Sequence, residues 1–206
     1  MTKGPIVKRA RVCYTLSIHH QGDEHMKWLI ASDLHGSAYY CKELLSAFDR
    51  EGADRMLLLG DLLYHGPRND LPRDYDPKAV TALLNQRQGD VLAVRGNCDA
   101  DIDQAVLNFP LLADYALIAE GKKLIFATHG HLFSLDHLPP LHAGDVLLHG
   151  HTHVPACETR DEITYLNPGS LSIPKENSPH GYMTLEDGVF LWKELDTGAV
   201  YREHRL

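Results

Sequence analysis

The chain has 206 residues, of which 44% are hydrophobic and 23% are charged, which is typical of one soluble globular domain that is large enough to bury a core. No apolar run approaches the roughly 18 residues of a membrane span, and the formal net charge of −8 disfavours nucleic-acid binding, which needs a basic face. The four cysteines lie far apart without a CxxC pair, so the sequence predicts neither a zinc ribbon nor a disulfide framework and favours a reducing cytoplasm.

The first 25 residues differ from the rest of the chain. Four Lys and Arg residues precede the first acidic residue, and the apolar stretch VCYTLSI is too short and too mixed for the core of a signal peptide. One interpretation of this basic segment is an organellar transit peptide, and the other, which we favour, is an upstream start codon or an unstructured extension. We therefore predict a disordered extension over residues 1–25, a working start at Met26, and one domain over residues 26–206.

From Met26 to residue 107, predicted strands and helices alternate. Three short apolar runs have the composition of buried strands: residues 27–31, 55–59 and 91–94. The segments between and after them are predicted as helix at 37–51, a Pro-, Asp- and Gly-rich loop at 62–76, helix at 77–88 with an aspartate cap and proline at its first position, and a short helix at 99–107. This alternation predicts parallel strands that are joined by right-handed crossovers.

The second half of the chain is predicted to be mostly strand. Residues 114–130 have the pattern of two strands around Glu120 and Gly121, which is a hairpin signal. Further short strands broken by tight turns are predicted at residues 145–150, 156–160, 162–167, 181–187, 188–195 and 199–204. No repeat or low-complexity linker divides the chain, so the sequence predicts a single α/β domain.

Five of the apolar runs are followed at once by Asp, Asn or His. These polar residues are Asp33 with His35, Asp61, Asn97, His129, and His151 with His153. In open α/β sheets ligands bind at the carboxyl ends of the strands, where loops project from a rigid support. The set offers carboxylate, amide and imidazole groups and, apart from Cys98, no thiolate. Such mixed nitrogen and oxygen donors favour divalent cations such as Mn, Fe or Zn.

The spacing of these residues strengthens the metal interpretation. In an extended segment residues i and i+2 point the same way, so Asp33 with His35, and His151 with His153, can each present two side chains together. Seven candidates exceed the needs of one ion and suit two ions that share a carboxylate, the arrangement that phosphatases and nucleases use with metals roughly 3.5–4 Å apart. For any single Asp or Asn a helix cap would be the simpler interpretation, but the complete set favours metal.

The ordered motifs D-x-H, G-D-x₃-H-G, G-N-x-D, a histidine after a strand, and G-H-T-H resemble those of the calcineurin-like metallophosphoesterases. The segments GDLLYHGPRN, VRGNCD, THGHLF, GHTHVP and NPGSLSIPK are similar to the small bacterial branch of that family, over Met26 to about Leu195. The resemblance implies a metallophosphoesterase-type α/β fold, a two-sheet β-sandwich flanked by helices. It also implies two metal sites that share Asp61, one with Asp33, His35, Asp61 and His153, the other with Asp61, Asn97, His129 and His151.

The same resemblance implies a phosphodiesterase that uses two divalent cations, Mn²⁺ first, with Zn, Fe, Ni or Mg as alternatives. A hydroxide that bridges the metals would attack phosphorus, with Asp61 and Asn97 at the metals and Asp99 fixing an adjacent group. Many relatives have histidine in place of Cys98, and that histidine is thought to protonate the leaving oxygen. Because a thiol is a weaker acid than imidazolium, Cys98 favours diesters with good leaving groups, such as aryl esters.

Four further residues are candidate substrate contacts: Arg68, Asn69, His65 and His131. Arg68 and Asn69 lie in the loop after Asp61, where a solvated arginine is the alternative to a phosphate contact that guanidinium groups make well. His65 would hold that loop or bond a ligand, and His131 would line a substrate pocket or pack. Three other histidines are interpreted as ordinary surface or capped residues: His137, His142 and His149.

The expected partner is a small-molecule phosphodiester. Nothing in the sequence indicates specific nucleic-acid or membrane binding, and a homo-oligomer is compatible with it. Two alternatives belong to other classes: a phosphomonoesterase or phosphoprotein phosphatase of the same superfamily, generally larger and with additional arginine motifs, and a non-catalytic scaffold of the same fold, as in a retromer subunit. A scaffold would have lost metal ligands, whereas all seven candidates are present in this chain.

Overall fold

The computed structural model describes residues 12–15 and 26–206, and its strands form two six-stranded sheets. Sheet A contains, in order across the sheet, β1 (Val12–Thr15), β5 (Tyr115–Glu120), β6 (Lys123–Thr128), β7 (Val146–Leu148), β9 (Ile163–Asn167) and β8 (Ala156–Arg160). Sheet B contains β12 (Val200–Arg205), β11 (Val189–Glu194), β10 (Gly181–Glu186), β2 (Trp28–Ala31), β3 (Arg55–Leu58) and β4 (Val91–Ala93). Both sheets are mixed, and the predicted two-sheet α/β fold is confirmed.

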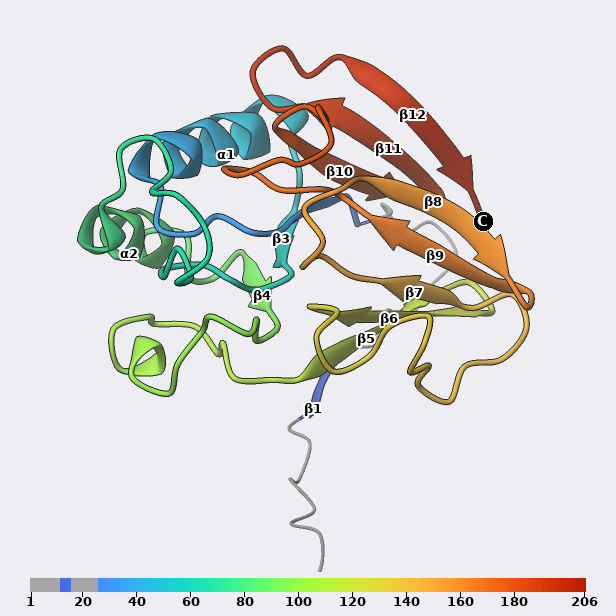
Figure 1. Cartoon of the computed structure of the whole chain (residues 1–206). Helices are drawn as coiled ribbons and strands as arrows, with labels where there is room; N and C mark the ends of the chain where they lie inside the picture. The colour runs from blue at the N-terminus through green and yellow to red at the C-terminus, as the bar shows by residue number, and fades with distance from the viewer. Residues whose placement is uncertain (1–11, 16–25) are drawn as a thin grey trace, which may run out of the picture.

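Two α-helices lie on sheet B (Figure 1). Helix α1 (Ala38–Glu51) begins at Ser37, whose side chain accepts a hydrogen bond from the backbone N–H of Tyr40, and α2 (Pro77–Asn85) begins with Asp76 as cap and Pro77 in its first turn. The predicted helix at 99–107 is only a 3₁₀ turn, η1 (Asp103–Ala105). In residues 12–15 and 26–206, no helix is long and apolar enough to cross a membrane.

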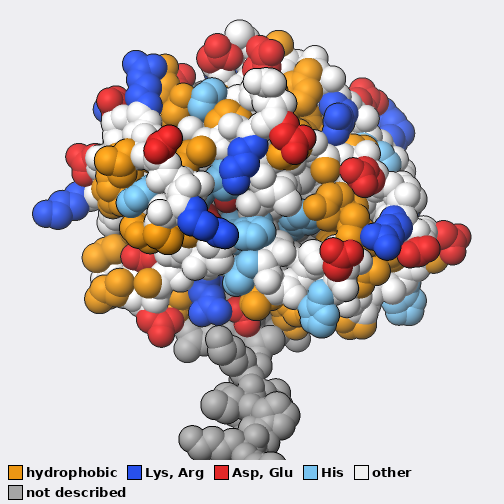
Figure 2. All heavy atoms as spheres, viewed as in Figure 1, with side chains coloured by type: hydrophobic (Ala, Val, Ile, Leu, Met, Phe, Trp, Pro, Cys, Tyr) orange, Lys and Arg blue, Asp and Glu red, His pale blue; other side chains and the backbone are white. Residues whose placement is uncertain are grey.

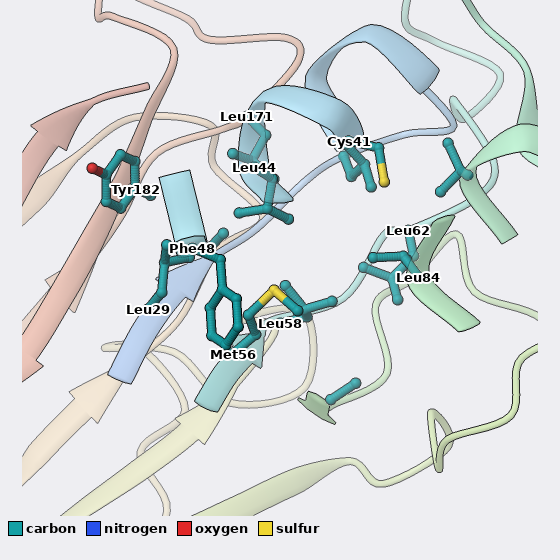
Figure 3. Packing of buried hydrophobic residues seen from close by; sticks show 14 of the residues in the cluster. Leu29, Cys41, Leu44, Phe48, Met56, Leu58, Leu62, Leu84, Leu171 and Tyr182 are labelled. Carbon is teal, nitrogen blue, oxygen red and sulfur yellow. The ribbon is translucent and has the colours of Figure 1, made fainter. Parts of the chain in front are cut away.

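The side chains of β2 point alternately to the two faces of sheet B, and both faces are buried. Leu29 packs with Leu44 and Phe48 of α1 in the cluster between the sheet and the helices, as Figure 3 shows. Its neighbour Ile30 points the other way, into a second cluster that joins sheet B to sheet A and includes Trp192. Successive residues of a strand point to opposite faces, so a continuous apolar run is what a strand between two layers requires.

The carboxyl ends of five strands meet at one end of the sandwich. In sheet B, β2, β3 and β4 are parallel, and in sheet A, β6 and β7 are parallel. Parallel strands carry their following loops to the same edge. The backbone N–H of His151, after β7, donates to Asp33 Oδ2, after β2, at 3.0 Å, which shows that the loops of the two sheets are in contact there.

Residues 12–15 form an edge strand of sheet A. β1 runs parallel to β5, with Val12 paired with Tyr115 and Thr15 paired with Ile118. The predicted disordered extension covers residues 1–25, but residues 1–11 and 16–25 lie outside the described residues, so for them it stays a prediction. The four residues between are described as a strand.

Candidate metal centre

The strand-end residues singled out in the sequence lie together at the junction of the two sheets. Three groups of possible ligand atoms lie within 4.8 Å of one another: Asp33, His35 and His153; Asp33, Asp61 and His129; and His35, Asp61 and Cys98. The loops after β2 and β3 therefore supply the carboxylates, and the loops after β6 and β7 supply imidazoles from the other sheet. No single segment could build this arrangement, because its members come from both sheets.

The first cluster surrounds Asp33. Its Oδ1 atom lies 3.5 Å from His35 Nε2 and 3.3 Å from His153 Nε2. The two imidazole nitrogens are themselves 3.3 Å apart. All three side chains are buried, so water has little access to the atoms that face one another.

The second cluster surrounds His129. Its Nε2 atom lies 3.1 Å from Asn97 Oδ1 and 3.2 Å from His151 Nδ1. Asp61 lies between the two clusters, because its Oδ2 atom is 3.5 Å from His129 Nε2 and 3.7 Å from His35 Nε2. The structure thus brings all seven predicted residues together in the grouping that the resemblance implies, and their role as ligands remains a prediction.

Backbone carbonyls fix the orientation of three of the imidazoles. The Nδ1 atoms of His35, His129 and His153 lie 2.8, 2.7 and 2.6 Å from the carbonyl oxygens of Tyr64, Leu59 and Ile173. A carbonyl can only accept, so Nδ1 carries the proton in each ring. In the neutral ring Nε2 then holds a lone pair that faces the cluster, which is the tautomer of a metal-ligating histidine whose other nitrogen donates outward.

The arrangement leaves polar atoms that protein groups do not satisfy. Asp33 Oδ1 is buried and has no hydrogen-bond donor among the described residues, and in the neutral tautomers the facing lone pairs of His35 and His153 would repel each other. A buried group without a partner costs about 1–3 kcal/mol. A divalent cation among these atoms would satisfy all of them, and carboxylate, amide and imidazole donors without a required thiolate suit Mn, Fe or Zn. The residues therefore fit a pair of divalent cations.

Most of the candidate ligands have a left-handed backbone. The φ angles of Asp33, His35, Asp61, His151 and His153 are 58°, 50°, 57°, 68° and 64°. A non-glycine residue in this region costs on the order of 1–3 kcal/mol and persists only where its surroundings impose it. Here the backbone N–H groups of Asp33 and His35 donate to the carbonyls of Gly60 and Asp61 at 3.2 and 2.8 Å, so the loops after β2 and β3 hold each other.

Two glycines allow the loops to approach this closely. A Cβ atom on Gly96 would overlap the carboxylate of Asp61, and one on Gly150 would overlap the side chain of Ser32 and lie 2.8 Å from Asp33 Oδ2. Neither glycine has a positive φ angle, so space rather than backbone conformation requires the missing side chain. Each glycine places a neighbouring loop directly against a candidate ligand.

The carboxylates give the clusters a strong preference for positive charge. Burial alone would raise the pKa of Asp33, but the imidazoles of His153 and His35 outweigh burial and hold the pKa well below its usual value. Burial would lower the pKa of His129, yet its hydrogen bond to Asp61 and the charge of Asp33 raise the pKa to about 9. A proton on His129 thus supplies positive charge beside the carboxylates where a metal cation would supply it, and metal binding would have to release that proton.

Asp99 joins the loops after β3 and β4. Its carboxylate accepts hydrogen bonds from the backbone N–H groups of Asp61, Leu62 and Gly96 at 2.8, 2.8 and 2.7 Å. Burial, followed by the charge of Asp61, raises the pKa of Asp99 to about 6. Asp99 does not face the clusters directly and instead fixes the backbone of the residue that lies between them.

A cavity of about 390 Å³ lies over the clusters. Its wall consists of His35, Asp61, Gly66, Pro67, Arg68, Asn69, Asn97, Cys98, His151, His153 and Lys175. Arg68 and Asn69 lie on this wall and His65 and His131 do not, and a role in substrate binding stays a prediction for all four. Figure 2 shows histidine side chains near the centre of one face of the molecule, with Lys and Arg side chains beside them.

His65 lies behind the cavity loop. Its ring packs edge-on against the rings of Tyr64 and Tyr75, with centroids 4.7 and 5.2 Å away, and its carbonyl accepts a hydrogen bond from Asn69 Nδ2 at 2.8 Å. Of the two roles open to it in the sequence, the geometry favours holding the loop. His131 is half-buried with its ring 5.4 Å from that of His129, and burial, then the charge of His129, lowers its pKa to about 4.

Sequence reasoning missed three residues at the end of β9 and just after it that support the clusters. Asn167 Nδ2 donates to the carbonyl of Gly150 at 2.8 Å and to Thr152 Oγ1 at 3.1 Å, which holds the loop that carries His151 and His153. The hydroxyls of Ser170 and Ser172 donate to the carbonyl of Asp33 at 2.9 and 3.0 Å. The signal was the segment NPGSLSIPK, whose polar and turn-forming residues directly follow a buried strand.

Comparisons with known proteins agree with this geometry. A model of the calcineurin-like phosphoesterase superfamily domain matches residues 26–187. Phosphodiesterase YfcE of Escherichia coli K12 is 47% identical over 164 residues, which are 80% of this chain and 89% of that protein. A YfcE structure superposes with a TM-score of 0.84 at 43% identity, over 87% of this chain and 99% of that one. The structure of Vacuolar Protein Sorting 29 from Cryptosporidium parvum superposes with a TM-score of 0.58 at 18% identity, over 89% of this chain and 100% of that one. This likeness shows the fold alone.

Proposed function

The chain belongs to the calcineurin-like phosphoesterase superfamily and is a hydrolase of the YfcE phosphodiesterase kind, and from this premise we propose that it cleaves phosphodiesters with two divalent cations. The observation that carries the proposal is the pair of clusters joined by Asp61, in which carbonyls turn imidazole lone pairs toward buried carboxylate oxygens. Among the described residues Asp33 Oδ1 is buried and accepts no hydrogen bond, although two imidazole nitrogens lie 3.3 and 3.5 Å away, as expected of an oxygen that shares a cation with them.

In the proposed reaction the oxygen of water attacks phosphorus and the bond from phosphorus to one ester oxygen breaks. The products are a phosphomonoester and the alcohol of the leaving group. When bound, a metal pair would activate water and offset charge on the phosphoryl oxygens. The holding residues would be Asp33, His35, Asp61 and His153 for one ion, and Asp61, Asn97, His129 and His151 for the other. Asp99 keeps Asp61 in place through their 2.8 Å hydrogen bond.

We propose that the enzyme prefers diesters with good leaving groups, because Cys98 is a poor proton donor. Its thiol is on the cavity wall, and burial together with the charge of Asp61 raises its pKa to about 12. A thiol in this environment gives its proton to a leaving oxygen poorly, and general-acid help is typically worth about 10² to 10⁴-fold. Esters whose leaving group departs as a stable anion, such as aryl diesters, lose the least from its absence.

The metal requirement is tested by stripping the protein with chelator and reloading it with Mn, Zn, Ni, Fe or Mg. Each form is then assayed against a matched panel of phosphomonoesters and phosphodiesters. We expect no turnover without metal, recovery with two equivalents, the highest rate with Mn²⁺, and faster cleavage of diesters. Turnover confined to monoesters would instead identify a phosphomonoesterase, and a fully loaded protein that is inactive on the whole panel would favour a scaffold.

The role of Cys98 is tested by the dependence of rate on the leaving group. For a series of diesters that differ only in leaving-group pKa, Cys98→His should flatten the slope of log rate against that pKa, because an imidazole can supply a proton. Cys98→Ala is the matched control, since it removes the thiol without adding an acid, and it should keep the steep slope. Equal slopes in all three proteins, with metal lost from the variants, would show that Cys98 serves the metal site instead.

Mn²⁺ as the native metal and the cytoplasm as the compartment complete the proposal. Among the described residues the candidate donor atoms are nitrogen and oxygen, with the Cys98 thiol as the one sulfur beside them, which suits borderline and harder cations. Cys41, Cys98 and Cys157 are free thiols, as a reducing compartment allows. Metal analysis of protein purified from its native cells without chelator would test the first point directly.

A further inference from the structure

One cation on the cavity wall has no role in the reaction described so far. Lys175 follows the NPGS segment after β9 and shares the wall with Arg68, which comes from the loop after β3. Both side chains are exposed, and among the described residues neither makes an ion pair or a side-chain hydrogen bond. Two unpaired positive charges therefore reach the same cavity from two different loops.

The backbone beneath Lys175 is fixed even though its side chain is free. Its N–H donates to the carbonyl of His153, a candidate ligand, at 3.1 Å. Its carbonyl accepts from the backbone N–H and the hydroxyl of Ser178 at 3.0 and 2.6 Å. The next two residues, Glu176 and Asn177, have φ angles of 55° and 58°, so the chain turns sharply away and leaves Lys175 at the rim.

The loop beneath Arg68 is also held. Asn69 Nδ2 donates to the carbonyl of His65 at 2.8 Å, and the backbone N–H of Asn69 is 3.4 Å from the carbonyl of Gly66. His65 in turn packs between Tyr64 and Tyr75. The two cations are thus presented from ordered supports, and a ligand that pairs with them would order only side chains.

The charge near the clusters exceeds what one phosphodiester needs. Two divalent cations with the two aspartates and the attacking hydroxide would leave about one positive charge, which the single negative charge of a phosphodiester balances. Arg68 and Lys175 add two further positive charges beside the clusters. A substrate with only one negative charge would leave this excess unpaired, so the cavity suits a ligand with additional negative charge.

We propose that Lys175, together with Arg68, forms a subsite for a second anionic group on the substrate, carried by the alcohol that stays bonded to phosphorus. The inference rests on the proposed phosphodiesterase function and names its substrate class as diesters with an additional carboxylate or phosphate group. Water displaces the other alcohol, and the product monoester keeps the second anionic group. Arg68 would add a planar donor fork and Lys175 a compact ammonium charge.

The test uses Mn-loaded protein and three p-nitrophenyl diesters with the same leaving group. Their retained alcohols are glycolic acid, ethanol and choline, which carry negative, no and positive charge. We expect kcat/KM to fall in that order, with about a tenfold advantage of the glycolate ester over the ethyl ester, as one added charge contact at a solvated rim supplies. Lys175→Gln should remove most of this advantage, and Lys175→Arg should restore it.

Lys78→Gln is the matched control, because Lys78 is an exposed lysine that lines a different cavity, and it should leave the order of the three esters unchanged. A binding measurement separates the inference from the proposed function. Calorimetry should show phosphoglycolate binding tighter than ethyl phosphate, with the difference lost in Lys175→Gln. If no ester is cleaved, the proposed function fails while this binding difference still decides the subsite. Equal kcat/KM for the three esters, or an order that Lys175→Gln does not change, would overturn the inference.

Discussion

The two ends of the sandwich both hold non-glycine residues in left-handed backbone, but for different reasons. At the hairpin end Asp161, Glu162 and Asp187 have φ angles of 50°, 64° and 50° and are exposed. There the tight turn sets the conformation, and Asn or Gly would serve as well. At the metal-centre end Asp33 and Asp61 are also left-handed, but they are buried and present oxygen atoms to the clusters. At the hairpin end the left-handed backbone follows from the turn alone, so glycine could replace these residues. At the metal-centre end glycine could not replace them, because their side chains supply the donor atoms.

The strongest challenge to this comparison is substitution of Asp61. Asp61→Asn should abolish turnover and lower the metal content of both sites, because the shared oxygen loses its charge while asparagine still tolerates left-handed backbone. Asp61→Ala should give the same loss. Elemental analysis and kinetics measure both effects, and Asp187→Asn at the hairpin end is the matched control that should change neither. Two equivalents of metal in an active Asp61→Ala protein would rule out the assignment.

A smaller loss of metal affinity is expected when a methyl group is added next to a candidate ligand and all the ligands are kept. In Gly96→Ala the new Cβ overlaps the Asp61 carboxylate, so we expect at least a tenfold fall in metal affinity and a loss of about 1–3 kcal/mol in the free energy of unfolding. Gly89→Ala is the control, because a Cβ there meets nothing within 4 Å. Denaturant titrations and metal titrations on both variants make the comparison, and equal behaviour would contradict the close approach.

The charge preference of the metal-centre end predicts an unusual pH dependence. In metal-free protein the pKa of His129 is raised to about 9, so its stabilising contribution is complete below its unfolded pKa of about 6.5 and is lost as the pH rises through 9. Metal affinity should rise over the same range, because fewer protons must leave. Unfolding titrations of metal-free and metal-loaded protein from pH 6 to 9.5 check both signs. Metal-free His129→Gln should flatten the profile.

The smallest effect is expected at the hairpin end. Glu162 is exposed in the two-residue turn between β8 and β9, and Glu162→Gly should relieve about 1–2 kcal/mol of left-handed strain while adding about 0.5–1 kcal/mol of unfolded-state entropy. The net gain should be about 0.5 kcal/mol of stability, with turnover unchanged. Thermal unfolding and the standard assay measure it. A change in metal content or rate would show that the two ends are coupled.

Sequence reasoning found the strands and the donors because each leaves a local signal. The run Met56, Leu57, Leu58 has no polar break, as a strand between two layers requires, and Asp61 follows it at the edge where parallel strands deliver their loops. The grouping of His129 with His151, and of His35 with His153, joins loops from different strands, and it came from a family resemblance rather than from spacing.

What the sequence did not predict depends on long-range contacts. The segment 99–107 has helical composition, yet only Asp103–Ala105 forms a 3₁₀ turn, and the Asp99 carboxylate bonds the backbone N–H groups of the β3 and β4 loops instead of capping a helix. Asn167 is an unremarkable residue until its bond to the Gly150 carbonyl is seen. Lys175 is likewise one exposed lysine among several, and only the fold brings it to the cavity.

Asn167 also contacts the other sheet, because its backbone carbonyl accepts a hydrogen bond from a tryptophan there. The indole N–H of Trp192, in β11, donates to the Asn167 carbonyl at 2.7 Å, while the Asn167 amide holds the His151 loop. The chain has two tryptophans, and Trp192 is fully buried. Trp28 is buried in the same cluster, so in a Trp28→Phe protein the ultraviolet fluorescence of Trp192 would report, without any added dye, on changes at the residue that holds the histidine loop.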